Sequence, residues 1–212
     1  MVSVTVENRT LFDMTANDLR VPATQADRPE PVLADLLAQR WSPRSFDAEH
    51  VIADAELALL LEAGRWAPSS RNGQARRFVI GRRGGVLFGQ ISETLAANNA
   101  TWAPQAALLL VGVLVRKDEA GRVESFAEYD LGQAIAHIGL QAEEMGLRMR
   151  QIGGFDRAAL SGALGLGAPL EPFIVAAIGR QAHASLLHGE LAVRETAPRT
   201  RLPIGDIVLA RD

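Results

Sequence analysis

The stretch YDLGQAIAHIGLQAEEMGLRMRQIGGFD, residues 129–156, decides the fold of this chain. Its first part carries apolar residues at steps of four, three, four and three positions: Leu131, Ile135, Ile138, Ala142 and Met145. This spacing predicts a long helix over residues 128–147 with an apolar stripe along one side. Small residues on the other flanks of the helix would let a second element approach closely: Gly132, Ala134, Ala136 and Gly139. RMRQI (148–152) then predicts a strand that runs into a turn at Gly153 and Gly154.

Four more segments have the pattern of strands. ALLLVGVLV (107–115) is continuous, aliphatic and rich in β-branched residues, which is typical of a strand buried on both faces. The other strands are expected at RRFVIGR (76–82), PFIVAAIG (172–179) and DIVLA (206–210). Helices are expected over residues 33–40, 55–66, 85–97 and 156–164, and Asp54 is placed to cap the second of them. Strands that alternate with helices predict an α/β or α+β sandwich around one sheet.

The length and composition fit one large domain. The chain has 212 residues, of which 48% are hydrophobic and 22% are charged, so it can bury a sizeable core. Residues 1–31 are expected to form an N-terminal arm, and residues 32–212 the domain itself. The longest apolar run (103–115) is about 13 residues, against the roughly 20 needed to cross a bilayer. The first residues lack the basic region of a secretory signal, so neither a membrane span nor secretion is expected.

The charged residues and the absence of cysteine exclude several classes of site. With no cysteine, the chain has no disulfide, thiolate nucleophile or cysteine-based metal site, and it is compatible with a reducing cytoplasm. The net charge is −3 and the sequence pI is about 5.8, and the basic residues are scattered along the chain. Nucleic acid is therefore not an expected partner.

The common catalytic patterns are also missing. The four histidines have no metal-ligand spacing: His50, His137, His183 and His188. No G-x-S-x-G motif of a serine hydrolase occurs. GRRGG (81–85) lacks the spacing of a dinucleotide-binding loop and is expected to be a turn. Glu143 and Glu144 are adjacent on the predicted long helix and are expected to lie at the surface.

Four other stretches carry groups suited to an anion or a flat ligand. RWSPRSFD (40–47) places two arginines and a serine around a proline, where a chain reversal would make an anion site. WAPSSRNGQARRFVI (66–80) crowds hydroxyls and amides between a helix and a strand. RMRQIGGFD (148–156) ends in glycines that allow a ligand to approach the backbone. APRTRLPIGDIVL (197–209) brings two arginines together in an extended tail. Each stretch taken singly has an ordinary structural explanation.

In this combination and order, the stretches resemble the FMN-dependent nitroreductase family. RWSPRSFD is similar to the family's R-x-S-x-R-x-F opening, and APSSRNGQARRFVI (67–80) to its A-P-S-x-x-N-x-Q-P-W-x-F-x-V motif. Residues 129–156 resemble its long core helix, strand and glycine turn, followed by the next strand at PFIVAAIG. RTRLP (199–203) resembles its basic C-terminal motif, so the likeness covers roughly residues 33–210.

The resemblance implies an α+β fold with a central, mostly antiparallel sheet flanked by helices. It implies a homodimer that exchanges a C-terminal strand and holds FMN at the subunit interface. The FMN phosphate would be held by one serine and three arginines: Arg40, Ser42, Arg199 and Arg201. Guanidinium groups supply the paired, charge-assisted donors that a phosphate needs.

The remaining cofactor contacts are implied in the same way. Arg44 would lie near N1 and O2 of the isoalloxazine, with Asn99 or its neighbour Asn98 at the same edge. The backbone of Gly153 and Gly154 would lie near N5. The other implied contacts are Trp41, Pro68, Ser69, Ser70, Asn72 and Ile152, with residues 68–72 reaching the flavin from the neighbouring subunit.

The activity implied is a ping-pong reaction. NADH or NADPH would reduce the flavin at N5, and a small nitroaromatic or quinone-like oxidant would then be reduced. The cofactor supplies the chemistry, so no catalytic side chain and no metal are expected. A dehalogenase or flavin-modifying relative of the same fold, a non-catalytic flavin-binding dimer and a structural protein without flavin remain as alternatives.

Two departures from the family pattern stand in the sequence. Gln-Pro-Trp of the family motif is Gln74-Ala75-Arg76 here, which adds a charge at the start of this strand. The chain between Trp102 and Tyr129 also lacks the longer insertion that some members place over the substrate.

Overall fold

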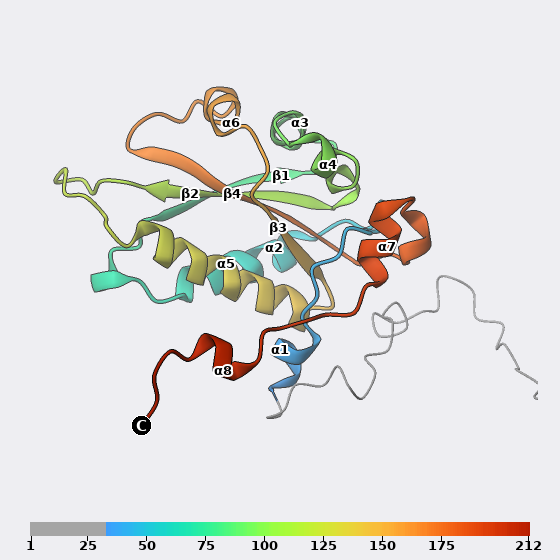
Figure 1. The fold of residues 1–212 in the computed structure, drawn as a ribbon. Coiled ribbons are helices and arrows are strands. Elements are labelled where there is room, and N and C mark those ends of the chain that lie inside the picture. The colour runs from blue at the N-terminus through green and yellow to red at the C-terminus, as the bar shows by residue number, and fades with distance from the viewer. Residues whose placement is uncertain (1–32) are drawn as a thin grey trace, which may run out of the picture.

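One antiparallel sheet of four strands carries the fold, in the spatial order β1-β2-β4-β3 (Figure 1). The computed structural model describes residues 33–212, and the arm expected over residues 1–31 lies outside the described residues. The strands are β1 (Arg76–Arg82), β2 (Leu108–Val115), β3 (Arg148–Ile152) and β4 (Leu170–Gly179). The three pairings in this sheet are antiparallel, and the predicted strands at these four places are confirmed.

Strand β2 lies inside the sheet and separates two apolar cores. Its side chains alternate between the two: Leu108, Leu110 and Leu114 on one face, and Leu109, Val111 and Val113 on the other. Every residue of β2 except Val115 is buried, as expected for a strand covered on both faces. At Gly112 the pairing with β4 is irregular, and a Cβ there would lie 2.7 Å from Ile174 Cγ2. The glycine therefore allows β2 and β4 to pack closely at the bulge.

Helices cover both faces of the sheet (Figure 1). One face carries α2 (Asp54–Trp66) and α5 (Ala127–Glu144), with the short α1 (Asp35–Gln39) against α5. The other carries α3 (Val86–Glu93), α4 (Ala97–Ala100) and α6 (Arg157–Ala163). Two short helices follow β4, namely α7 (Glu190–Thr196) and α8 (Ile204–Ile207), and single 3₁₀ turns occur at Ser70–Asn72, Ala103–Gln105 and Ala184–Leu186. The predicted α+β sandwich is confirmed. No helix within residues 33–212 has the length and apolar character of a membrane span.

The small residues of α5 face two different surfaces. A Cβ at Gly139 would lie 2.6 Å from Met149 Cε, so this glycine lets β3 pack against the helix. Ala134 is fully buried in the same layer. Gly132 and Ala136 are exposed instead, and a Cβ at Gly132 would meet nothing within 4 Å. Close packing within the chain therefore explains half of the small residues, and an outward face of α5 carries the others.

The strand expected at residues 206–210 is wrong for the single chain. A short helix, α8, occupies residues 204–207, and Leu209 beyond it is fully exposed. A strand is stable only where another strand edge accepts its backbone hydrogen bonds, and no strand of residues 33–212 pairs with this segment.

Two smaller expectations are also wrong. Asp54 is the first residue of α2 and does not cap it; the N–H of Ala53 instead donates to Glu56 Oε2 at 2.8 Å. Glu143 is buried, and its carboxylate forms an ion pair with Arg148 at 3.2 Å. Adjacent helical residues point about 100° apart, so Glu143 faces the interior while Glu144 is exposed, as expected.

Candidate functional site

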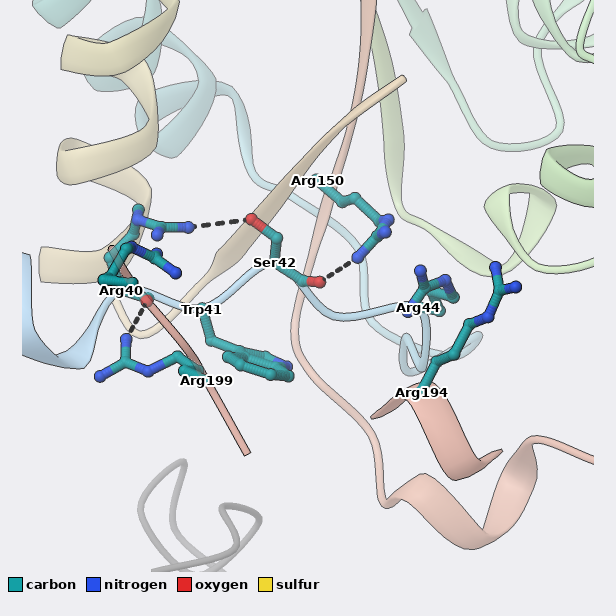
Figure 2. Close-up of a pocket in the computed structure, with 8 residues that line it drawn as sticks. Arg40, Trp41, Ser42, Arg44, Arg150, Arg194 and Arg199 are labelled. Carbon is teal, nitrogen blue, oxygen red and sulfur yellow. Dashed lines mark hydrogen bonds between the residues drawn. The ribbon is translucent and has the colours of Figure 1, made fainter. Parts of the chain in front are cut away.

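A strongly basic pocket of about 200 Å³ lies where the start of the domain meets its C-terminal tail (Figure 2). Six arginines, a tryptophan and a serine line it: Arg40, Trp41, Ser42, Arg44, Arg150, Arg194, Arg199 and Arg201. We call this the arginine pocket. Six of its residues were expected to contact FMN: Arg40, Trp41, Ser42, Arg44, Arg199 and Arg201.

The segment that contributes Arg40 to Arg44 is fixed against the end of β4. Ser45 is buried; its Oγ donates to the carbonyl of His183 at 2.8 Å, and its own carbonyl accepts from Ala182 N at 3.1 Å. The next residue, Phe46, forms a β-bridge with Gln181 and stacks on Trp102, with ring centroids 6.2 Å apart. The alternation of a buried serine, a buried phenylalanine and outward arginines therefore holds one wall of the pocket rigidly.

A buried carboxylate from α7 closes the same wall. Glu195 is 6% exposed and accepts backbone hydrogen bonds from Arg44 N at 2.8 Å and Ser45 N at 3.4 Å. The Arg44 guanidinium lies 4.0 Å from the same carboxylate. Burial lowers the pKa of Arg44, and the charge of Glu195 opposes this shift. Glu195 thus orients the backbone of Arg44 and partly compensates its charge.

One end of the arginine pocket is formed by Arg40 and the tail. Arg40 Nη1 donates to Ser42 Oγ at 2.9 Å. Arg199 donates to the carbonyls of Arg40 at 2.9 Å and Ala38 at 2.6 Å, which fixes the tail beside α1. Burial, and then the positive charges of Arg201 and Arg199, lower the pKa of Arg40. These cations crowd one another, and an anion between them would relieve that repulsion.

The other end is formed by Arg44, Arg150 and Arg194 (Figure 2). Arg150 comes from β3, donates to the carbonyl of Ser42, and lies over the ring of Trp102 with its Cζ 5.5 Å from the centroid. Burial, followed by the nearby charge of Arg44, lowers the pKa of Arg150 to about 10. Arg194 is more exposed and pairs with Glu190 of the same helix at 3.2 Å.

The glycine turn after β3 is joined to the segment that carries the two asparagines. Asn99 Nδ2 donates to the carbonyl of Gly154 at 3.1 Å, and Ala96 N donates to the same carbonyl at 3.0 Å. Gly153 and Gly154 are exposed, whereas the side chain of Ile152 is buried in the core. The structure therefore brings Asn99 together with the glycine turn. The carbonyl of Asn98 accepts from Thr101 Oγ1 at 3.1 Å.

The remaining expected site residues lie elsewhere in the single chain. Pro68, Ser69, Ser70 and Asn72 form the loop between α2 and β1, and they do not line the arginine pocket. Ser70 N donates to both carboxylate oxygens of buried Asp130, at 3.1 Å each, near the start of α5. Glu143, near the other end of α5, is close enough to the pocket residue Arg40 to influence its pKa, so the arginine pocket lies toward that end of the helix. Within one chain, residues 68–72 and the arginine pocket therefore lie toward opposite ends of α5.

Arg76, which departs from the family motif, has a structural position. It is 6% exposed, and its Nη2 donates to the carbonyls of Ala67 at 2.7 Å and Arg65 at 3.1 Å. These are the last carbonyls around the end of α2, which a cation satisfies well. Arg76 therefore holds the loop that starts at Ala67, and it contributes no charge to the arginine pocket.

Two pocket residues, Arg150 and Arg194, were missed from the sequence, as was Glu195, the buried carboxylate beside Arg44. An arginine in the otherwise apolar strand 148–152, directly before two glycines, was the available signal for Arg150. No comparable signal marks the other two, because the stretch before Ala197 lacks clear periodicity. Arg194 and Glu195 lie beside Arg44 because α7 packs against the segment 40–47 in the folded chain.

Comparisons with known proteins agree with this fold. The profile described as Nitroreductase family matches residues 37–87. An uncharacterized 15.4 kDa protein in the ask 5′ region of Mycolicibacterium smegmatis is 30% identical over 139 residues, covering 62% of this chain and 92% of that protein. A solved oxidoreductase containing FMN is 27% identical with a TM-score of 0.82, covering 88% of this chain and 95% of that one. A candidate NAD(P)H:FMN oxidoreductase of Staphylococcus epidermidis shares the fold at 18% identity and a TM-score of 0.70, covering 84% and 94%.

Proposed function

Because the chain belongs to the nitroreductase family, we propose that it is an FMN-dependent oxidoreductase that uses NADH or NADPH to reduce nitroaromatics, quinones or similar small oxidants. The observation that carries the proposal is the arginine pocket, which unites the basic motifs from the two ends of the domain. The FMN in the structural neighbour and the NAD(P)H in the name of the Staphylococcus epidermidis protein support the choice of cofactor and electron donor.

The pocket residues fit the phosphate of FMN. A phosphate monoester carries up to two negative charges, and guanidinium groups bind it with paired, charge-assisted hydrogen bonds. Arg40, Ser42 and Arg201 would hold it, while Arg199 keeps the tail beside them through its two bonds to backbone carbonyls. Burial lowers the pKa of Arg40 most, and the charges of Arg201 and Arg199 lower it further; the phosphate would offset that repulsion.

Other residues would orient the rest of the cofactor. Arg44, with its backbone fixed by Glu195, would place a positive charge at the N1 and O2 edge of the flavin, where charge accumulates on reduction. Asn99 and the exposed backbone of Gly153 and Gly154 would bind the flavin ring, with Ile152 and Trp41 beside them. FMN, when bound, supplies two-electron transfer between NAD(P)H and the oxidant. The protein supplies orientation and charge, and no acid or base side chain is required.

A homodimer would complete this site. Asp130, which holds the loop of Ser70, and Glu143, which is close enough to Arg40 to influence its pKa, lie about 20 Å apart along α5. Two copies packed with antiparallel α5 helices would bring Pro68, Ser69, Ser70 and Asn72 of one copy to the arginine pocket of the other. The single-chain pocket of about 200 Å³ is also smaller than the roughly 300–1,000 Å³ typical of small-molecule sites.

The outward face of α5 offers a surface for this contact. It carries Tyr129 at 68% exposure, together with exposed Gly132 and Ala136, where small side chains allow helices to approach. We expect Ala136→Glu to convert the dimer into a monomer, because it places like charges against each other at a packed helix contact. Analytical ultracentrifugation of both proteins measures this. A dimer that withstands the substitution would exclude this face.

The C-terminal segment would cross to the partner. Leu202, Ile204, Ile207 and Leu209 are all more than half exposed in the single chain. The outer edge of β1 has no strand beside it among the described residues. The segment 206–210 would then form its expected strand on the β1 edge of the second copy. Deletion of residues 204–212 should weaken dimerisation and lower the melting temperature, because the β1 edge of each copy would lose the strand that the other copy supplies.

The absorption spectrum of the purified protein, before and after anaerobic addition of NADPH and of NADH, tests the proposed function. A flavin spectrum that bleaches with either donor, and returns on addition of a nitroaromatic or quinone, supports the reaction. A flavin spectrum unchanged by both donors would indicate a non-catalytic flavin-binding protein. Reoxidation by halotyrosines alone would indicate the dehalogenase. A colourless protein that does not bind added FMN would exclude all of these functions.

A further inference from the structure

Within residues 33–212, the arginine pocket holds more positive charge than one FMN phosphate can compensate. Six guanidinium groups line it. Among residues 33–212, the ion pairs of these arginines involve two carboxylates, Glu190 and Glu195. If both are subtracted, four positive charges remain, and the phosphate supplies at most two negative ones. The excess indicates that the pocket binds a second anionic group.

The excess lies at a defined place. On one side, Arg40 donates to Ser42 and feels the charges of Arg199 and Arg201, an arrangement that suits a phosphate. Arg150 and Arg194 lie on the other side, next to Arg44 (Figure 2). Arg150 reaches the pocket from β3, where burial and the neighbouring Arg44 disfavour its charge. No carboxylate pairs with Arg150 in the part of the chain that the structure describes.

We propose that Arg150 and Arg194 bind an oxyanion group, a carboxylate or a phosphate, on the reactant that meets the flavin beside Arg44. The proposal rests on the proposed function, because it gives the substrate class of that same site. Such a group can come from an acidic oxidant, such as a nitro- or quinone-carboxylate, or from the 2′-phosphate of NADPH. Both sources present the same chemistry to two guanidinium groups.

The geometry favours an anion over a neutral group. Arg150 is fixed by its bond to the Ser42 carbonyl and by its position over Trp102, so it is already oriented and has donors left for a ligand. Arg194 is 58% exposed in its side chain and can turn from Glu190 toward an incoming anion. Arg150 and Arg194 thus form a clamp, in which the fixed Arg150 loses little side-chain entropy on binding.

The reactions used in the test are the two-electron reductions of a nitro group and of a quinone. A nitro group accepts two electrons and two protons, becomes nitroso and releases water. NAD(P)H supplies a hydride and becomes NAD(P)⁺, and the second proton comes from solvent. For a quinone, the same two electrons and two protons give the hydroquinone.

The first arm compares matched oxidants with the FMN-loaded protein. We expect kcat/KM for 4-nitrobenzoate to exceed that for neutral 4-nitrobenzyl alcohol by about tenfold, as two charge-assisted contacts would give after screening by solvent. Arg150→Gln and Arg194→Gln should each lower this ratio severalfold. The second arm measures the NADPH-to-NADH ratio of kcat/KM in the same variants with menadione as the neutral oxidant.

Binding without turnover provides an independent readout. Titration calorimetry with benzoate and benzyl alcohol should show selective binding of benzoate that weakens in Arg150→Gln and as salt increases. Arg65→Gln is the matched control, because Arg65 is an exposed arginine paired with Glu62 outside the pocket. This control should change neither ratio.

The two arms distinguish the sources of the anion. A change in the oxidant ratio alone assigns the clamp to an acidic oxidant, and a change in the donor ratio alone assigns it to the NADPH phosphate. If Arg150→Gln and Arg194→Gln change neither the oxidant ratio, nor the donor ratio, nor benzoate binding, while menadione is reduced normally, the proposed anion clamp is wrong and the proposed function remains. If menadione is not reduced, benzoate binding still decides whether the clamp exists.

Discussion

Two groups of arginines in this chain differ in how their charge is balanced. At the end of the sheet where β4 begins, Arg116 bonds Glu171 at 2.6 Å and Glu128 at 2.9 Å, and Arg157 lies 3.5 Å from Glu171. We call these the paired arginines. Six guanidinium groups line the arginine pocket, and within residues 33–212 two of them, Arg44 and Arg194, form ion pairs with a carboxylate. The same residue type therefore forms a neutral network in one region and an excess of positive charge in the other.

The pKa shifts follow this difference. The hydrogen bond from Arg116 lowers the pKa of Glu171, and the same bond raises the pKa of Arg116. In the pocket, burial and neighbouring cations lower the pKa values of Arg40 and Arg150. Ion pairs therefore stabilise the charges of the paired arginines, whereas burial and like charges destabilise those of Arg40 and Arg150, and an anion in the pocket would offset the repulsion.

The largest effect is expected from removing a pocket arginine. Arg201 is exposed and bonds only the carbonyl of Thr200 among the described residues, so Arg201→Ala should leave the fold intact. It should weaken FMN binding by about 10- to 150-fold, since a hydrogen bond to a charged group contributes roughly 1.5–3 kcal/mol. Quenching of flavin fluorescence on binding measures this. Arg157→Ala, among the paired arginines, is the control that should stay within about twofold. Equal FMN affinity in both variants would remove Arg201 from the site.

A smaller effect is expected from removing Glu195, the buried carboxylate beside the arginine pocket. Glu195→Ala leaves the N–H groups of Arg44 and Ser45 without their acceptor and removes the counter-charge of Arg44. We expect the free energy of unfolding to fall by about 2 kcal/mol, because unsatisfied buried donors cost about 1–3 kcal/mol. Urea unfolding of the FMN-free protein measures the change. Glu195→Gln, which keeps one acceptor, should lose less, and a loss as large as that of alanine would argue against the hydrogen bonds.

The paired arginines should show a smaller, pH-dependent effect. Glu171→Gln is expected to lower the free energy of unfolding by about 0.5 kcal/mol at pH 7, since its side chain is 37% exposed and solvent screens the pairs. The folded-state pKa of Glu171 lies below its unfolded value. Its contribution is therefore present above the unfolded pKa of about 4.3 and is lost as the pH falls through the folded pKa. The difference between the unfolding curves of the two proteins should be smaller at pH 3 than at pH 7.

The smallest effect is expected outside both groups. Arg122 pairs with Asp118 four residues away, and its side chain is 82% exposed. Arg122→Gln should change the free energy of unfolding by less than about 0.5 kcal/mol and leave FMN affinity unchanged. A fall in the free energy of unfolding as large as that of Glu195→Ala would contradict the prediction that exposed ion pairs contribute little.

Local pattern was sufficient for most of the framework. The uninterrupted aliphatic run of β2 required apolar cover on both faces, and the two cores beside it supply that cover. The stripe of Leu131, Ile135 and Ile138 fixed which side of α5 meets the sheet. The wrong strand at residues 206–210 shows the limit, because strand propensity has no effect without a pairing edge.

Fewer of the site residues could be predicted from local sequence pattern. The arginines of the opening segment and of the tail were recognised by their motifs, and the fold places them in one pocket. Arg194 and Glu195 were missed because the stretch that contains α7 has little periodicity, and the hydrogen bonds of buried Glu195 come from residues 150 and 151 positions away in the chain. Glu143 was misassigned because helical position, and not polarity, put it beside Arg148.

The sequence alone determined the four strands of the sheet, the main helices that cover it, the two apolar faces of the sheet, and the family to which the motifs belong. These follow from periodicity and from spacing along the chain, which are local properties. Only the tertiary structure decided that Arg150 and Arg194 join the motif arginines while Arg76 is withdrawn to the end of a helix. Whether a charge is balanced depends on which residues from distant segments lie within a few ångströms of it, and chain order does not encode that distance directly.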